Sequence, residues 1–373
     1  MLECYPEADL FCVFDTLSDG ERTSLSGKQS RSSFLQRMPG IARNHRLYLP
    51  LMPLAIEQLD LSGYDLILSS SYAVAKGVLT GPDQLHLSYV HSPMRYAWDL
   101  QHQYLLESGL SRGLKGSIAR IILQRMRIWD TRTANGVDAY IANSAFISRR
   151  IKKAYGRDAE VIYPPVSVPP DLVPRQKEDF FLTASRLVPY KNIHVIIEAF
   201  RHLPTEQLIV VGDGPEAARL HKLAGPNVTM TGFLPDTQLR ALMSAARAFI
   251  FAAEEDFGIT PVEAQAEGTP VIALARGGVQ ESVIGGDPEP TGLFFAVADA
   301  IEIADTLKIF IDREADFRPE HCHANALRFS VDQFKRNLTN FVDRKQKEFN
   351  KCLAVNRTPS IISPLSRAAR GQS

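Results

Sequence analysis

The sequence predicts an α/β protein of two domains, each built on a parallel sheet covered by helices. The chain has 373 residues, and because a domain usually takes roughly 100–200 residues, two domains are expected. Short apolar runs without polar alternation are separated by segments of helical periodicity, which is typical of buried parallel strands joined by helices. The proline-rich stretch VIYPPVSVPPDLVPRQKED (161–179) follows neither pattern and is interpreted as the linker between the domains.

The expected strands follow one another in both halves of the chain. In the N-terminal half they are residues 10–14, 64–70, 86–91, 139–144 and 160–166; in the C-terminal half they are 179–186, 207–214, 227–232, 246–253 and 269–274. We therefore expect an N-terminal Rossmann-like domain at 1–165 and a C-terminal Rossmann-like domain at 166–345. The polar residues 346–373 are expected to form a disordered tail.

Composition excludes several classes of protein. Lys+Arg and Asp+Glu are both 42, so the formal net charge is zero, which argues against a dedicated nucleic-acid-binding protein. The four cysteines form no CxxC pair, so neither a zinc site nor a redox motif is expected. Reduced thiols, no signal-peptide pattern and no apolar run of ~20 residues favour a cytoplasmic protein.

The segment SRGLKGSIARIILQRMRIWDTR (111–132) has many basic residues and apolar residues at helical spacing. One interpretation is a surface helix packed on its own domain. The other is a basic amphipathic helix that contacts an anionic membrane, the inner membrane face, or a lipid-linked acceptor.

Two glutamates stand eight positions apart in FAAEEDFGITPVEAQAEGTPV (251–271). Thr260 suits an N-cap and Pro261 a first helical position, so Glu263 completes a capping-box pattern. A functional interpretation uses the same helix end, because a helix N-terminus binds phosphate and a nearby carboxylate accepts hydrogen bonds from sugar hydroxyls. Glu255, on the preceding loop, is predicted to act in the same way, with a solvated loop acid as its alternative.

Two further segments favour a phosphate ligand. In TASRLVPYKNIHVIIEAF, Arg186 follows a strand and Lys191 precedes a helix, a pairing that suits a diphosphate. In LIVVGDGPEAARLHKLAG, Gly212 and Gly214 allow close approach of a ligand to the backbone. Ala217 replaces the third glycine of a GxGxxG motif, so NAD binding is only weakly indicated, and a tight turn without a ligand also explains the pattern.

Taken together, R-x4-K, GDGPE, E-x7-E and GTPVIALARGGVQESV resemble the C-terminal domain of family-4 glycosyltransferases, which have the GT-B fold. The resemblance covers roughly residues 1–345. The stretches HSPMRYAWDLQHQYL, VDAYIANSAFISRRIKKAYGRDAEVIYPPV and SRLVPYKN are similar to the bacterial mannosyltransferases of O-antigen and exopolysaccharide synthesis.

The resemblance implies a donor site between the two domains. Arg186 and Lys191 would hold the diphosphate, Glu263 the ribose and Glu255 the donor sugar. His91, in YVHSPMRY, matches a histidine of the N-terminal domain that faces the sugar, with a strand-end cap as its alternative. The implied nucleotide-sugar-binding residues also include Gly212, Gly214, Gly258, Ile259 and Thr260. Gly277 with Gly278 is interpreted as a backbone wall or a turn, and Asn143 with Ser144 as structural residues.

The implied reaction is transfer of a sugar, with mannose from GDP-mannose expected, to a glycan or lipid-linked acceptor with retention of configuration. Because negative charge grows on the leaving diphosphate, fixed cations would supply the main catalytic term. No metal ligands and no cofactor are predicted. Relatives open with a strand and a Gly-Gly loop that this chain lacks before YPEADLFCVFD, so the N-terminal domain is expected to be incomplete.

Two other classes of function compete with this one. A catalytically inactive nucleotide-sugar-binding homologue or partner subunit is favoured by the absent N-terminal loop. An NAD-dependent enzyme is disfavoured, because no acidic residue follows a true GxGxxG at the expected distance.

Overall fold

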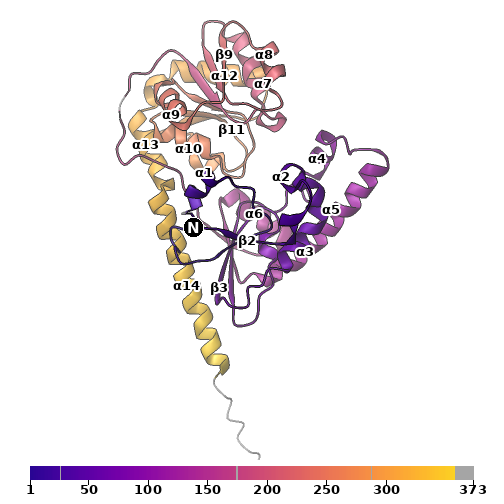
Figure 1. Ribbon diagram of the computed structural model, residues 1–373. Helices are drawn as coiled ribbons and strands as arrows, with labels where there is room; N and C mark the ends of the chain where they lie inside the picture. Colours follow the sequence, from indigo (N-terminus) through magenta and orange to yellow (C-terminus); the bar gives the residue numbers. More distant parts are fainter. Residues whose placement is uncertain (26, 174, 287, 358–373) are drawn as a thin grey trace, which may run out of the picture.

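The chain folds into two parallel α/β domains joined by the segment 162–180 (Figure 1). The computed structural model describes residues 1–25, 27–173, 175–286 and 288–357. All ten predicted strands are present, and the structure adds β2 and β12. The sequence pattern missed both because β2 is three polar residues, SRS, and β12 is a short GLFF segment that begins at a glycine.

The C-terminal domain is one continuous parallel sheet of order β12-β11-β10-β7-β8-β9. Its order reverses between β7 and β10, the arrangement in which open α/β sheets bind ligands at the carboxyl ends of their strands. Its strands are β7 Phe181–Ala184, β8 Leu208–Val211, β9 Val228–Gly232, β10 Phe249–Phe251, β11 Val271–Leu274 and β12 Gly292–Phe295. Its helices are α7 Ile193–Ala199, α8 Ala217–Leu223, α9 Asp236–Ala245, α10 Ile259–Ala266, α11 Val279–Ser282, α12 Ala300–Asp312 and α13 Pro319–Ala326.

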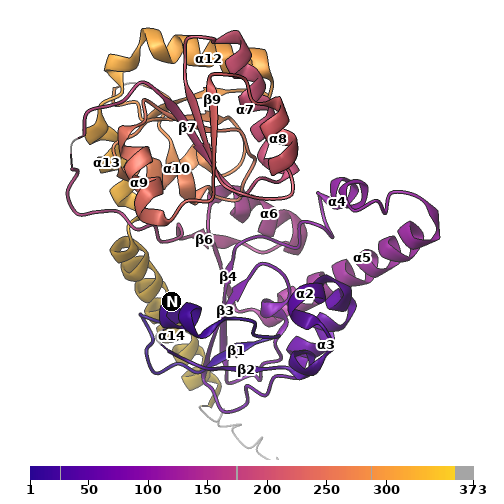
Figure 2. The ribbon, with the colours of Figure 1, turned by 45° about the horizontal axis from the view of Figure 1, so that its top comes forward.

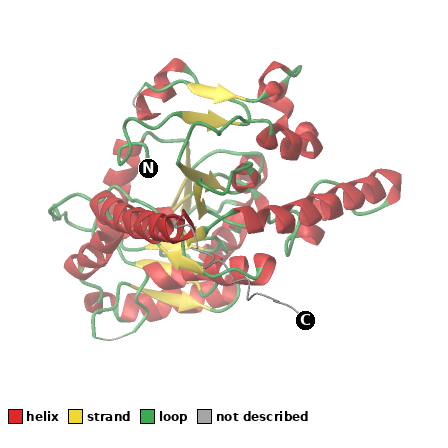
Figure 3. Ribbon diagram, turned by 90° about the horizontal axis from the view of Figure 1, so that it is seen from below, coloured by secondary structure: helices red, strands yellow, loops and turns green. Residues whose placement is uncertain are grey.

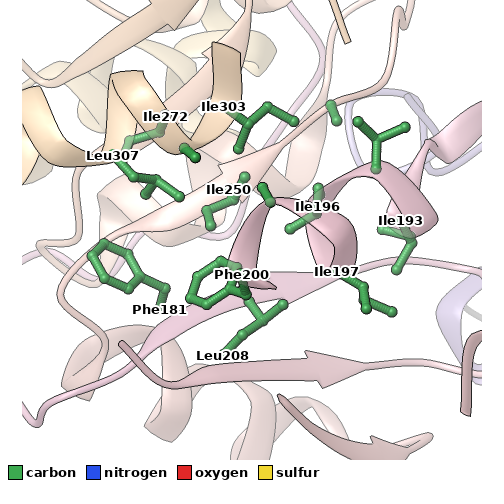
Figure 4. Close-up of a cluster of buried hydrophobic side chains, with 14 of the residues drawn as sticks. Phe181, Ile193, Ile196, Ile197, Phe200, Leu208, Ile250, Ile272, Ile303 and Leu307 are labelled. Atoms are coloured by element: carbon green, nitrogen blue, oxygen red, sulfur yellow. The ribbon is translucent and has the colours of Figure 1, made fainter. Parts of the chain in front are cut away.

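Apolar side chains from the strands and from helices α7 and α12 form the core on one face of this sheet (Figure 4). Phe181 and Ile250 from neighbouring strands pack with Phe200 after α7 and Leu307 on α12, and each of these side chains is fully buried. Because helices cover both faces of the sheet, side chains on both faces of each strand are buried. This explains why the strands are apolar without alternation in the sequence.

The N-terminal domain has two separate parallel sheets within the described residues. The first pairs β1 Leu10–Cys12 with β2 Ser30–Ser32, and the second has the order β3 Leu66–Ser71, β4 Leu85–Val90, β5 Ala139–Ala142 and β6 Ala159–Val161. Its helices are α1 Asp19–Arg22, α2 Ile41–Asn44, α3 Met52–Glu57, α4 Gln101–Glu107, α5 Gly113–Thr133 and α6 Ala145–Tyr155. No strand pair joins the two sheets in the part of the chain that the structure describes.

Helix α14, Val331–Arg357, returns from the C-terminal domain and runs along the N-terminal domain (Figure 1). Phe334, Leu338 and Phe341 lie about one turn apart and pack against Leu87 and Tyr89 of β4. The prediction assigned residues to 345 to the C-terminal domain and treated 346–373 as disordered. Both assignments are wrong for the described part, because an apolar stripe holds this helix on the N-terminal sheet; residues 358–373 lie outside the described residues.

The start of the predicted linker packs against the C-terminal domain. The backbone N–H of Val166 donates to the Phe329 carbonyl at 2.9 Å, and the Tyr163 ring lies 5.6 Å from Phe257 and 5.1 Å from Phe329. The connection is therefore fixed by both a backbone hydrogen bond and aromatic contacts.

Candidate functional site

Four loops meet at the carboxyl ends of the C-terminal strands. A Cβ built on Gly212 would lie 1.9 Å from the Ser185 carbonyl oxygen, and one on Gly214 would lie 2.4 Å from that of Leu187. The loop after β8 is thus pressed against the loop after β7. Both glycines also have positive φ, +135° and +158°, so any side chain here would be strained as well as crowded.

A second pair of loops is packed in the same way. A Cβ on Gly277 would lie 2.4 Å from the Glu255 carbonyl oxygen, and Gly278 donates its N–H to that oxygen at 2.9 Å. The Gly-Gly segment after β11 therefore supports the loop that carries Glu255. The predicted turn is present, and the predicted backbone wall beside a sugar stays a prediction.

The two pairs of loops are joined by an ion pair between Lys191 and Glu255. Asn192 follows with φ +55° and donates its side-chain N–H to the Ala252 carbonyl at 2.9 Å, which fixes the loop that presents Lys191. Arg186, from the same segment, is exposed. The structure thus brings Lys191 and Glu255 together as expected, while Arg186 forms no ion pair with the described residues.

Helix α10 starts earlier than the capping-box pattern predicted. Its N-cap is Gly258, at φ +87°, and no side-chain cap hydrogen bond is formed. Pro261 is consequently the third helical residue and Glu263 the fifth, so the predicted Thr260 cap and Glu263 capping box are wrong. A glycine in this left-handed conformation ended the preceding loop two residues sooner than the sequence signals indicated.

The side-chain carboxylate of Glu263 accepts no hydrogen bond and forms no ion pair among the described residues, although its backbone carbonyl accepts from the Glu267 N–H at 3.2 Å. Burial raises the pKa of its carboxyl; Arg240 opposes this shift and Asp236 adds to it. A partly buried carboxylate without a protein partner costs stability, which is the behaviour expected of a group held for a ligand. Ile259 beside it is 46% exposed at the start of the helix.

His91 lies at the carboxyl end of β4 in the N-terminal domain. Its Nε2 is 2.8 Å from the Ser70 hydroxyl, and its ring stacks edge-on with Tyr89 at 5.2 Å. Burial lowers the pKa of His91, which favours the neutral imidazole. No hydrogen bond joins His91 to Lys191 or Glu255 within the described chain, so its predicted contact with the donor sugar stays a prediction.

Sequence reasoning missed the residues that join the two domains. Arg95 and Arg150 of the N-terminal domain both bind the carboxylate of Asp256, the residue after Glu255. Glu281 accepts hydrogen bonds from the first backbone N–H groups of α6. The only sequence feature that could have indicated Asp256 and Glu281 is their position in the chain, next to Glu255 and close to the Gly-Gly segment.

Ser144 and Asn143, interpreted as structural, are both buried. The Ser144 hydroxyl caps α6 by accepting from the Ile147 N–H at 3.1 Å and donates to the Asp256 carbonyl at 2.5 Å. Ser144 therefore has a structural role that also reaches across the domains.

Helices α4 and α5 project from the N-terminal domain (Figures 2 and 3). Along α5 the inner positions Leu123 and Met126 are buried in the domain. An outer apolar stripe is exposed: Leu114 78%, Ile118 50%, Ile121 53% and Ile128 64%. Within the described residues, none of the helices has both the length and the apolar character needed to cross a bilayer.

Comparison with known proteins places both halves of the chain in one group. A family model described as "Glycosyltransferase Family 4" matches residues 11–168, and one described as "Glycosyl transferases group 1" matches residues 168–328. The two models meet at residue 168, inside the connection between the domains.

Curated relatives include mannosyltransferases. A GDP-mannose-dependent alpha-(1-6)-phosphatidylinositol monomannoside mannosyltransferase of Mycobacterium tuberculosis is 28% identical over 229 residues, covering 53% of this chain and 57% of that protein. The O-antigen chain mannosyltransferase RfbU of Salmonella typhimurium is 32% identical over 133 residues, covering 33% of this chain and 38% of that protein. The matched segments thus span about half or less of these relatives.

Solved structures share the architecture over most of the chain. Sucrose-phosphate synthase from Thermosynechococcus elongatus superposes with a TM-score of 0.65 at 20% identity, covering 86% of this chain and 84% of that one. The lipopolysaccharide outer core galactosyltransferase WaaB superposes with a TM-score of 0.59 at 16% identity, covering 90% of each chain. These likenesses establish the two-domain GT-B fold.

Proposed function

Because the chain belongs to the family-4 glycosyltransferases and has the GT-B fold, we propose that it transfers a sugar from a nucleotide-sugar to a glycan or lipid-linked acceptor. The proposed donor is GDP-mannose, and the proposed setting is surface polysaccharide synthesis. Mannosyltransferases among the relatives, including one named as GDP-mannose-dependent, support this choice.

The observation that carries the proposal is the Lys191–Glu255 pair at the meeting point of the strand-end loops. Lys191 is a cation on the loop after β7, and Glu255 is a carboxylate on the loop after β10, beside the N-terminus of α10. This arrangement combines a cation for a diphosphate with an acceptor for sugar hydroxyls at the switch point of the sheet.

In the proposed reaction the bond between the anomeric carbon and the diphosphate oxygen breaks, and negative charge collects on the leaving diphosphate. The acceptor hydroxyl oxygen forms the new bond to the anomeric carbon, and its proton passes to the leaving diphosphate. Lys191 would move from Glu255 to this diphosphate, and exposed Arg186 would add a second cation. Glu255, released from Lys191, would accept hydrogen bonds from the donor sugar. Glu263, which has no partner among the described residues, would bind the ribose.

Retention of the anomeric configuration and independence of metal ions are parts of this proposal. Protein cations would do the work that a metal does elsewhere, since preorganised positive charge stabilises a leaving group directly. Transfer should therefore persist in the presence of a chelator such as EDTA.

The proposal is tested by incubating the protein with GDP-mannose, UDP-glucose and other nucleotide-sugars while nucleotide release is measured. GDP release from GDP-mannose is expected. Lys191→Ala and Arg186→Ala should each lower it by about 10²–10³-fold, the usual cost of losing one group that stabilises developing charge. Lys222→Ala, an exposed lysine on α8, is the matched control and should not change the rate. Absence of binding and release with every donor would overturn the proposal.

The alternative is a nucleotide-sugar-binding protein without transferase activity. The separation of β1–β2 from β3–β6 favours it, because the N-terminal domain is the expected source of acceptor contacts. It predicts that GDP-mannose binds in calorimetry and that Lys191→Ala weakens this binding, with no nucleotide released.

We also propose that α5 lies on an anionic membrane surface, where a lipid-linked acceptor would be found. Its exposed apolar stripe is flanked by exposed Arg112, Lys115 and Arg125, a combination that suits the interface of acidic lipids. Sedimentation with phosphatidylglycerol vesicles tests this: Ile118→Ser with Ile121→Ser should reduce binding, whereas Ile309→Ser, on an equally exposed position of α12, should not. Equal loss in the control, or self-association through this stripe without vesicle binding, would contradict it.

A further inference from the structure

The carboxylate of Asp256 binds two arginines of the N-terminal domain. Arg95 Nε lies 3.1 Å from Asp256 Oδ1 and its Nη2 binds the same oxygen, while Arg150 Nη1 lies 3.4 Å away. All three side chains are largely shielded, with exposed fractions of 19%, 12% and 23% for Arg95, Arg150 and Asp256. Such charge-assisted contacts are stronger than those of an exposed surface pair.

Glu281 makes the second contact between the domains. Its carboxylate accepts from the N–H groups of Ala145 at 2.7 Å and Phe146 at 2.9 Å. Ala145 and Phe146 are the first residues of α6, and N–H groups at this position have no partner inside the helix. The start of a helix also carries a partial positive charge. A carboxylate from the C-terminal domain thus caps a helix of the N-terminal domain.

Both contacts converge on α6. Arg150 lies within this helix, and Ser144, its N-cap, donates to the Asp256 carbonyl at 2.5 Å. The C-terminal domain therefore contacts α6 at two places. Glu281 binds the start of the helix, and Asp256 binds Arg150 on its side.

These two acids are also attached to the candidate site. Asp256 directly follows Glu255, and a Cβ on Gly278 would lie 2.3 Å from the Asp256 carbonyl oxygen. Glu281 lies in α11, about one helical turn after the Gly-Gly segment that supports the Glu255 loop. A movement of α6 away from Asp256 and Glu281 would pull on the same loops that present Glu255 to Lys191.

We propose that Asp256 and Glu281 are positioning residues that hold the two domains closed on the site and keep Glu255 in register with Lys191. This inference deepens the proposed function and rests on it for the catalytic consequence, but not for the domain closure. We call Asp256, Glu281 and their contacts with Arg95, Arg150 and the start of α6 the latch. The latch acts by positioning Glu255 and does not touch the substrate.

The experiment compares Asp256→Asn/Glu281→Gln with Asp99→Asn. Asp99 also pairs with Arg150, yet both residues belong to the N-terminal domain, so its loss removes a charge contact without opening the domains. Small-angle X-ray scattering of the unliganded proteins should give a larger radius of gyration for the double variant and an unchanged one for Asp99→Asn. Arg95→Gln/Arg150→Gln, which removes the Asp256 contact from the other side and keeps the Glu281 contact, should also expand, but by less.

Kinetics add the catalytic readout. In the double variant kcat for donor turnover should fall about tenfold, because correct placement rather than a reacting group is lost, while donor affinity changes by less than about twofold. Circular dichroism checks that each variant is folded, and a variant that does not fold is replaced by the single Asp256→Asn or Glu281→Gln.

The outcomes separate the two proposals. Unchanged scattering in folded latch variants from both sides would overturn the latch, whatever the activity. Expansion of the molecule with no turnover by any donor would leave the latch in place and count against the proposed transferase function.

Discussion

The two domains are built on the same parallel α/β plan but hold themselves together differently. The C-terminal domain has one six-stranded sheet with an apolar core, whereas the six strands of the N-terminal domain are divided into sheets of two and four. The N-terminal domain also contains a buried ion pair, in which Lys76 binds Asp130 on the inner side of α5.

This difference matches the division of labour at the site. The loops that carry Arg186, Lys191 and Glu255 all leave the continuous sheet, where neighbouring strands fix their positions. The N-terminal domain reaches the site through Arg95 and Arg150, which approach from a loop and a helix. The loops of the candidate site thus leave the domain with the uninterrupted sheet, and the other domain contacts them through arginine side chains.

The largest effect is expected where the N-terminal domain depends on its buried charges. Lys76 and Asp130 have exposed fractions of 1% and 0%, and Lys76 Nζ also donates to the Asp130 carbonyl at 2.6 Å and the Thr133 hydroxyl at 2.9 Å. Lys76→Met should destabilise this domain by about 3–5 kcal/mol, because it leaves a buried carboxylate without its counter-charge.

Urea unfolding measures this loss, with the C-terminal domain as internal reference. The matched control is Lys308→Met, which breaks the exposed Lys308–Asp305 pair on α12 and should cost less than about 1 kcal/mol. If both variants lose the same small amount of stability, the N-terminal domain does not depend on its buried pair and the comparison fails.

How far the sequence predicts this molecule depends on how local each signal is. The strands follow from runs of a few apolar residues, so all ten were found, whereas polar β2 lacked the signal. The Arg95–Asp256 contact joins residues 161 positions apart, and no local pattern marks two such residues as partners. The start of α10 was misplaced because the left-handed Gly258, not Thr260, ends the loop.

The site shows the same limit. The pairing of Lys191 with Glu255 follows from their places at the ends of parallel strands, which meet at one edge of a sheet. The unpaired carboxylate of Glu263 and the packing of α14 on the N-terminal sheet depend on distant neighbours, so no local pattern predicts either. The roles of Arg186, His91 and Glu263 toward a donor stay predictions.

A second effect, of intermediate size, concerns pH. His86 on β4 is fully buried, with Ser69 Oγ at 2.9 Å and the Gly136 carbonyl at 3.2 Å, and burial lowers its pKa to about 4. The folded state therefore binds fewer protons than the unfolded chain between pH 4 and 6.5. Its contribution to stability is complete above the unfolded value and is lost as the pH falls.

Between pH 7 and pH 5 this loss should amount to about 2 kcal/mol for the N-terminal domain. His86→Gln, which cannot titrate, should remove that part of the pH dependence in urea unfolding at the two pH values. His202→Gln, an exposed histidine of the C-terminal domain, should leave it unchanged. An identical pH dependence in the native protein and His86→Gln would show that the buried histidine does not distinguish the two domains.

The smallest effect on stability, and the one that bears most on function, is expected at Glu263 in the C-terminal domain. Burial raises the pKa of its carboxyl, so the folded state disfavours the charged form, and this cost is present above the unfolded pKa and disappears as the pH falls. Glu263→Gln should therefore raise stability at neutral pH by less than about 0.5 kcal/mol while weakening donor binding in calorimetry. Glu267→Gln, at the C-cap of the same helix but paired with Arg240, should lower stability and leave donor binding unchanged. A Glu263 variant that is both less stable and equally able to bind donor would mean that this carboxylate serves the fold, and that the continuous sheet does not hold it for a ligand.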